Sequence, residues 1–71
     1  MPQKKEALHK INEFIKEPLI RIVGENVESK IVKLEEGLSI AYESGLDLVE
    51  ISSNSNPPVC KVIDYNELLI S

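Results

Sequence analysis

Cys60 is the residue whose type most directly suggests chemistry, because a thiolate is a strong nucleophile. A reactive cysteine needs a nearby base, cation or helix N-terminus that lowers its pKa. The only histidine of the chain, His9, lies far from Cys60 in the sequence, in a polar N-terminal stretch. Cys60 alternates with Lys61 in the apolar run VCKVID, which directs the thiol toward a core. We therefore expect a buried cysteine and no catalytic residue.

Other arrangements that carry chemistry are missing from the sequence. One Cys and one His do not supply the ligand set of a zinc site. Glu35 and Glu36 are adjacent at the start of a helical pattern, where their side chains diverge, so they are typical of a helix N-terminus and not of an acid/base pair. There is no glycine-rich phosphate loop. The sequence predicts no metal, no cofactor and no small-molecule substrate, and thus a protein that is not an enzyme.

Charge is distributed unevenly along the 71 residues, whose formal net charge is −4. Residues 1–21 carry a balance of +2 and residues 22–71 a balance of −6. We interpret residues 1–10 as a flexible basic arm on an acidic body. No apolar stretch approaches the ~20 residues that cross a membrane, and the single cysteine favours a cytoplasmic protein.

Hydrophobic periodicity predicts one α+β domain. Turn residues and a ten-residue helical pattern separate four short runs rich in branched residues. The expected order is strand, strand, helix, strand, strand (β-β-α-β-β), over residues 19–23, 27–34, 35–44, 46–52 and 59–64. The first two strands should form a hairpin, and the helical crossover should make the second and third strands parallel within a mixed sheet. One α-helix packed on a four-stranded sheet leaves one sheet face open.

Alternation predicts which side chains lie on that open face. Arg21, Glu50 and Lys61 each stand between apolar neighbours, so all three are expected there. Within the helix, Gly37 suggests a close approach to the sheet, and Gly45 suggests the C-terminal stop. The pair Pro57-Pro58 should give the last strand a stiff, extended start.

Four sequence motifs, taken together at their spacing, are too specific to be a chance match to a known family. The combination of KIN at residues 10–12, IRIVG at 20–24, LDLVEIS at 46–52 and NPPVCKVIDY at 56–65 resembles the N-terminal domain of bacterial translation initiation factor three. The resemblance covers residues 10 to about 66. It implies one helix on a four-stranded mixed sheet, in agreement with the order predicted from periodicity.

The resemblance also implies a function. Members bind the small ribosomal subunit with its 16S-type rRNA, help to select the initiator tRNA, prevent premature subunit joining and have no enzymatic activity. Residues 11–66 are then the domain and residues 67–71 the start of an interdomain linker. The remainder of that linker and a C-terminal domain are expected to be missing from this chain.

Candidate contact residues follow from the matched motifs and from the basic side chains. For rRNA, tRNA or the ribosome they are Lys10, Asn12, Lys16, Arg21, Lys61 and Tyr65. The expected linker junction is Asp64, Tyr65 and Asn66. Asn66 is followed by Glu67 and Leu68, where the family usually has a lysine and an aromatic residue, so this end of the chain departs from the family pattern.

A second class of function is open to the same residues. The net charge of −4 is unusual for a nucleic-acid binder, and residues 68–70 form an apolar end (LLI). A general protein-interaction domain without RNA contact is therefore the alternative.

Overall fold

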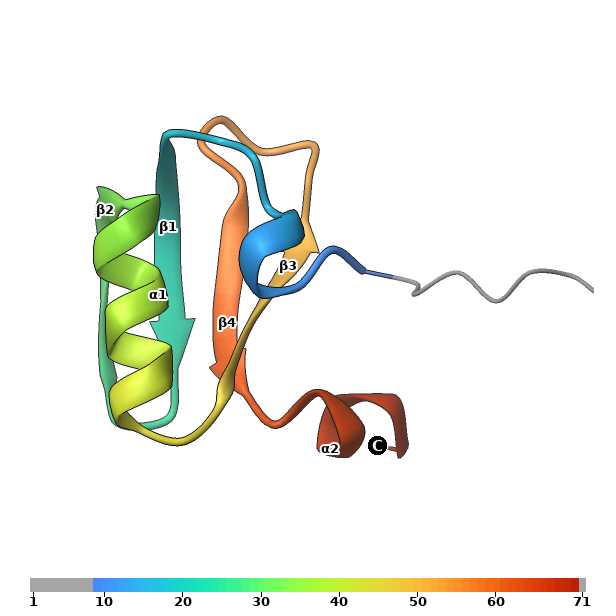
Figure 1. Ribbon diagram of the computed structural model, residues 1–71. Coiled ribbons are helices and arrows are strands. Elements are labelled where there is room, and N and C mark those ends of the chain that lie inside the picture. The colour runs from blue at the N-terminus through green and yellow to red at the C-terminus, as the bar shows by residue number, and fades with distance from the viewer. Residues whose placement is uncertain (1–8, 71) are drawn as a thin grey trace, which may run out of the picture.

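The computed structural model describes residues 9–70 of the chain, as a sheet with helices at one face and at one end (Figure 1). The elements are η1 (Asn12–Phe14, a 3₁₀ turn), β1 (Leu19–Gly24), β2 (Val27–Lys33), α1 (Leu34–Glu43), β3 (Asp47–Ser52), β4 (Val59–Ile63) and α2 (Tyr65–Ile70). The predicted α+β class and the β-β-α-β-β order are confirmed. The short helix α2 is additional, because six residues are too few for a helical period to stand out.

The sheet has the strand order β2-β1-β4-β3. β1 is antiparallel to β2 and parallel to β4, and β3 is antiparallel to β4. β2 and β3 therefore run in the same direction, as the crossover predicts, but they lie at opposite edges of the sheet and do not pair. The central parallel pair is β1 with β4, so the first and last strands of the chain hold the sheet together.

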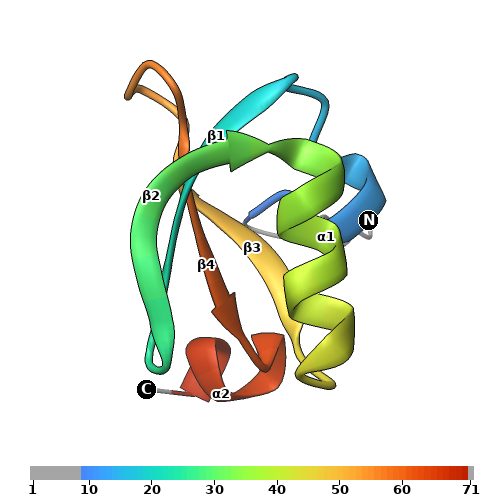
Figure 2. The same ribbon diagram turned by 90° about the vertical axis from the view of Figure 1, so that its left-hand side faces the viewer.

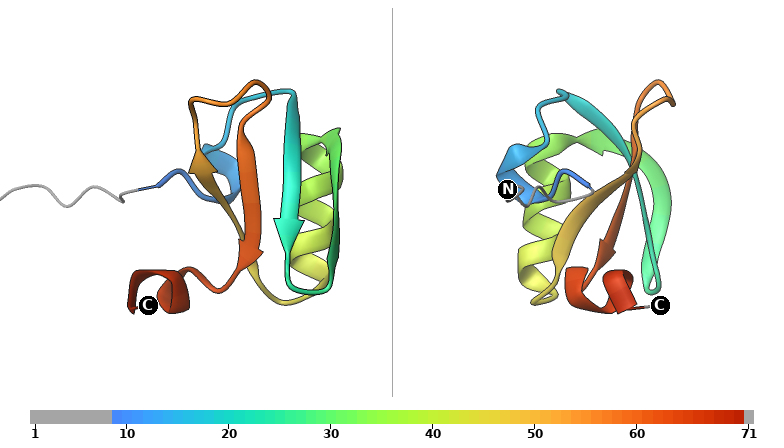
Figure 3. Two further views of the ribbon diagram at one scale, coloured as in Figure 1. Left: turned by 180° about the vertical axis from the view of Figure 1, so that it is seen from behind. Right: turned by 90° about the vertical axis from the view of Figure 1, so that its right-hand side faces the viewer.

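Two segments cover one face of this sheet. α1 packs against Ile20 of β1 and Leu48 of β3, and η1 lies beside α1 on the same side (Figure 2). Ile15, directly after η1, is 1% exposed and belongs to the same core as Ala41 of α1. The view from behind shows the opposite sheet face without a helix across its strands (Figure 3, left). The open face that was predicted is present.

The two helix glycines have the predicted roles. A Cβ on Gly37 would lie 2.7 Å from Cδ1 of Ile20 in β1, which shows how closely α1 approaches the sheet. Gly45 follows α1 with φ = +72°, a left-handed conformation that glycine adopts at little cost. Ala41 accepts the backbone N–H of Leu46 at 3.0 Å and so closes the C-terminal turn.

The expected position of Glu50 is wrong. Glu50 is the direct partner of Cys60, and Val49 is the direct partner of Lys61. Directly paired residues leave the sheet on the same face, so Glu50 lies on the α1 side and Val49 on the other. Val49 was expected to face α1. Leu48 and Val49 are both fully buried, on opposite faces of the sheet, so their apolar character does not show which of them faces α1. Arg21 and Lys61 do lie on the face that α1 leaves uncovered.

The N-terminal end of the described chain is attached to β3. The carbonyl oxygen of Lys10 accepts the N–H of Glu50 at 2.9 Å, and Ile11 forms an isolated antiparallel bridge with Val49. Lys10 is therefore joined to the domain through its backbone, although it was expected in a flexible arm. Residues 1–8 of that arm lie outside the described residues.

The start of β4 is fixed by its preceding proline. Pro58 is buried, and its carbonyl oxygen accepts the N–H of Arg21 at 2.9 Å, which begins the β1–β4 ladder. The Asn56–Pro57 peptide bond is cis. Across residues 9–70, no helix is long and apolar enough to span a membrane.

Candidate nucleic-acid interface

Three basic side chains lie along the sheet face that α1 leaves uncovered. The registers pair Leu19 with Lys33 and Val23 with Lys61, and Arg21 lies between these two positions on β1. Residues two apart on a strand share a face, so Lys33, Arg21 and Lys61 form a diagonal row across three adjacent strands. Diagonal neighbours of this kind are about 7–8 Å apart. We call this row the basic diagonal.

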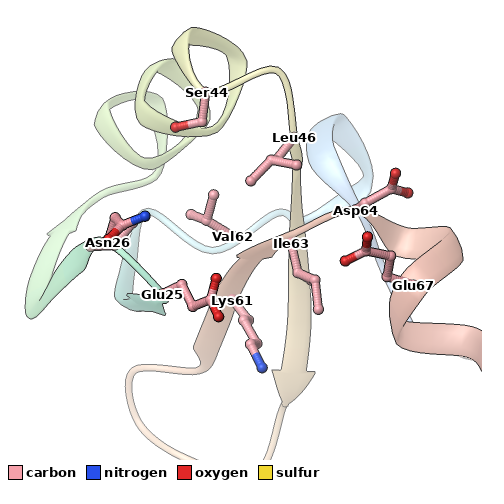
Figure 4. Close-up of a pocket in the computed structure, with 10 residues that line it drawn as sticks. Glu25, Asn26, Ser44, Leu46, Lys61, Val62, Ile63, Asp64 and Glu67 are labelled. Carbon is pink, nitrogen blue, oxygen red and sulfur yellow. The ribbon is translucent and has the colours of Figure 1, made fainter. Parts of the chain in front are cut away.

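The close-up of one end of the sheet shows this alternation directly. Val62 points toward α1, whereas Lys61 and Ile63 point to the opposite side (Figure 4). Lys61 is half-buried, and Arg21 and Lys33 are exposed. Sequence reasoning named Arg21 and Lys61 but missed Lys33, because β2 reads as a weak strand whose facing cannot be fixed without its register to β1.

Apolar side chains accompany the basic diagonal. Leu19 is 47% exposed and Ile31, the partner of Arg21, is 49% exposed. Both lie on the same face as the three bases. The surface therefore combines cationic groups, which attract phosphates, with accessible apolar area, which a partner can cover.

The opposite layer has the reverse charge. α1 carries Glu35, Glu36 and Glu43 and no Lys or Arg. The protein is thus polarised, with an acidic helix on one side of the sheet and the basic diagonal on the other. A net charge of −4 conceals this separation, which explains how an acidic chain can present a cationic surface.

Lys10 and Lys16 are not part of the basic diagonal. Lys10 precedes the bridge of Ile11 with Val49 in β3, which lies at the opposite edge of the sheet from β2 and Lys33. Lys16 lies in the segment between η1 and β1, where it lines a shallow hollow together with Leu19 and Lys33. Both lysines are exposed, and Lys16 adjoins one end of the basic diagonal.

Asn12 is engaged inside the domain. Its Nδ2 donates to Oδ1 of Asp47 at 3.1 Å, and its Oδ1 accepts the N–H of Leu48 at 3.0 Å. The residue has φ = +51°, a conformation that asparagine tolerates better than most residues. The side chain therefore fastens η1 to the start of β3, which accounts for an asparagine here without a ribosome contact.

Tyr65 is held in a similar way. Its backbone N–H donates to Oδ2 of Asp47 at 3.1 Å, and its hydroxyl accepts the N–H of His9 at 3.3 Å. The rings of His9 and Tyr65 meet edge to face with centroids 5.8 Å apart. Asp47 is the connecting residue that sequence reasoning missed, because an acid at the start of a strand looks like an ordinary solvated residue.

The expected linker junction begins α2. Oδ1 of Asp64 accepts the N–H of Asn66 at 2.9 Å, as the side chain of an N-cap residue does. The carbonyl oxygen of Asp64 accepts the N–H of Glu67 at 2.9 Å. Asp64, Tyr65 and Asn66 therefore form a defined helix start.

A hollow of about 350 Å³ lies between the β1–β2 turn, the end of α1 and the start of α2 (Figure 4). Three acids line it, Glu25, Asp64 and Glu67, with Lys61 as the basic residue at its border. An anionic lining disfavours phosphate there, so the hollow marks where the basic diagonal ends.

Cys60 lies in the core and is fully buried, as its alternation with Lys61 predicts. Burial, with a smaller contribution from the charge of Glu50, raises the pKa of Cys60 to about 12. A thiol in this environment stays protonated and is a poor nucleophile. Within residues 9–70 there is no group of three or more His, Cys, Asp or Glu side chains that could hold a metal ion.

Comparison with known proteins identifies the family. Residues 11–70 match the model of "Translation initiation factor IF-3, N-terminal domain". A translation initiation factor IF-3 of Parabacteroides distasonis is 49% identical over 61 residues, which cover 86% of this chain and 29% of the relative. The IF-3 of Bacteroides fragilis is 49% identical over 64 residues, covering 90% and 32%.

A third relative extends the same match. The IF-3 of Wigglesworthia glossinidia brevipalpis is 51% identical over 63 residues, which cover 87% of this chain and 32% of the relative. The chain thus spans about a third of the length of these relatives. Because the family model covers nearly all of the described fold, the chain belongs to the translation initiation factor IF-3 N-terminal domain family.

Proposed function

We propose that this domain binds the small ribosomal subunit through phosphates of its 16S-type rRNA, with the basic diagonal as the contact surface. The observation that carries the proposal is the alignment of Lys33, Arg21 and Lys61 on one sheet face of an otherwise acidic protein. Lys and Arg contacts to phosphates supply affinity without base specificity. Family membership supports a role in translation initiation.

Membership in the family also suggests a more specific role in initiation. We propose that the domain helps to control initiator tRNA selection and subunit joining in the cytoplasm, as a binding module and not as an enzyme. In this proposal α2 begins the linker to a C-terminal domain, and Asp64 and Asp47 set the direction in which the linker leaves. Lys10 and Lys16 remain candidate contacts beside the basic diagonal, whereas Asn12 and Tyr65 contribute mainly by positioning.

Co-sedimentation with purified small ribosomal subunits across a salt series tests the proposal. Each phosphate contact adds about 0.7–0.9 to the slope of log affinity against log salt, so three contacts predict a slope of roughly −2 to −3. Absence of binding at low salt would contradict the proposal.

The second candidate function is a protein-interaction domain without RNA contact. Leu69 and Ile70 of α2 are 49% and 83% exposed, and they offer an apolar end that a protein partner could cover. Apolar contact depends little on salt, in contrast to counterion release. Binding to small subunits with a slope near zero would favour this second function.

A further inference from the structure

Asp47 bonds to more than the start of α2, so its role goes beyond directing that helix. It is the first residue of β3, and its two carboxylate oxygens bind two different segments. Oδ1 accepts Nδ2 of Asn12 from the N-terminal segment, and Oδ2 accepts the N–H of Tyr65 at the start of α2. Residues 53 positions apart in the sequence are thereby bonded to one side chain.

A second connection joins the same two segments. The N–H of His9 donates to the hydroxyl of Tyr65 at 3.3 Å, and the two rings are in contact. The N-terminal segment also reaches the sheet through the backbone of Lys10 and Ile11 at the edge of β3, through the bond of Asn12 to Leu48, and through the buried side chain of Ile15. α2 has no fully buried residue, and its first turn is bonded to Asp47 and to His9.

We propose that Asp47 is a positioning residue that makes the docking of the N-terminal segment, residues 9–15, and the start of α2 interdependent. The physical reason is that both bonds fix the same two side-chain torsions of Asp47. When either donor is lost, the carboxylate can rotate, and the remaining bond loses its alignment. Hydrogen bonds to a charged acceptor are stronger than neutral ones, so the effect is large enough to measure.

Interdependence has a consequence for any partner. Linkage is reciprocal, so a partner that lifts the N-terminal segment from β3 also loosens α2, and one that holds α2 also strengthens the docking of that segment. The direction of α2 then responds to what the N-terminal segment contacts. This inference concerns the domain alone and does not depend on ribosome binding.

The most direct test replaces Asp47 by its amide isostere. The D47N side chain keeps the shape but has one oxygen acceptor, so it can serve only one of its two donors, and its amide N–H₂ faces the other. Interdependence predicts that amide hydrogen-exchange protection falls about tenfold both at Tyr65 and at residues 12–15. Heteronuclear NOE values of residues 66–70 should fall with it. A circular dichroism melt with one cooperative transition shows that the sheet stays folded.

The decisive variant is Asn12→Ala, which removes the bonds of Asn12 to Asp47 and to the N–H of Leu48 and alters no residue of α2. Interdependence predicts that N12A also lowers the protection of the Tyr65 amide and the NOE values of α2. Asp64→Ala is the reciprocal variant, because it removes the N-cap bond of α2 from the other side. Interdependence predicts that D64A, which loosens α2, also lowers the protection of residues 12–15. If N12A leaves residues 65–70 as they are in the unaltered domain, the two bonds are independent and the proposal is overturned.

Discussion

Glu50 and Cys60 are direct partners across β3 and β4, and both leave the sheet on the face that packs against α1. The thiol is fully buried there, while the carboxylate of Glu50 lies at a half-buried position near it. Burial is the main cause, and the charge of Glu50 the lesser one, of a pKa of Cys60 of about 12. Burial of the thiol, with the Glu50 charge as a smaller contribution, therefore makes Cys60 a poor nucleophile.

The reactivity of Cys60 provides a first prediction. Iodoacetamide at neutral pH should alkylate Cys60 in the folded domain on the order of a hundredfold more slowly than in the urea-unfolded chain, because the thiol is both covered and protonated. Mass spectrometry of timed samples measures both rates. Equal rates would show that the thiol is accessible and would reopen a catalytic interpretation.

The raised pKa of Cys60 also predicts a pH dependence of stability. The unfolded thiol titrates near 9.0 and the folded one near 12, so the folded state binds more protons between these values. The free energy of unfolding therefore has its full Cys60 contribution below about pH 9 and loses it as the pH rises toward 12, by up to about 1.4 kcal/mol per pH unit. Urea titrations at pH 8 and 10 should show a larger loss for the parent than for Cys60→Ala. An equal loss of unfolding free energy in the parent and in Cys60→Ala would show that Cys60 is not the cause of the pH dependence.

Adjacent residues at η1 make a matched pair for stability. Ile15 is 1% exposed and Phe14 is 69% exposed. Ile15→Ala should lower the free energy of unfolding by about 2–5 kcal/mol, because it leaves a cavity in the core. Phe14→Ala should change it by less than about 0.5 kcal/mol. Comparable losses for the two variants would mean that η1 does not dock as the structure describes.

Gly45 tests the end of α1. Its φ of +72° disfavours any residue with a side chain, although no atom beyond its two chain neighbours lies within 4 Å of the place a Cβ would take. Gly45→Ala should therefore destabilise the domain by about 1 kcal/mol through backbone conformation alone. Gly45→Asn should cost less, since asparagine tolerates this region. An alanine variant as stable as the parent in urea would contradict the assigned conformation.

The sequence was sufficient for the elements of the sheet and for α1. Branched runs, turn residues and a ten-residue helical pattern locate all four strands to within one or two residues. Periodicity could not give the register, and the phase of β3 was therefore assigned incorrectly at Glu50. Two consecutive buried residues, Leu48 and Val49, cannot both face α1, and only the pairing with β4 decides between them.

Only part of the candidate site could be predicted from the sequence, because periodicity does not give the register between strands. Arg21 and Lys61 lie in strongly apolar strands whose alternation is clear, and both were found. Lys33 ends a strand with few apolar residues and was missed. Asp47 was missed because its two bonds reach segments that are distant in the sequence, and no local pattern signals such a contact.

The central claim is that the sheet face with the basic diagonal binds RNA, and β2 offers a matched pair to test it. Lys33 and Lys30 are exposed lysines on one strand, but Lys33 pairs with Leu19 on the uncovered face and Lys30 pairs with Ile22 on the α1 side. Affinity for purified small ribosomal subunits should be measured for Lys33→Gln and Lys30→Gln across a salt series. Loss of one phosphate contact predicts a roughly fivefold to tenfold weaker affinity at 0.1 M salt and a shallower salt slope for K33Q, with K30Q close to the parent. Equal losses in the two variants, or none in either, would contradict the assignment of this face.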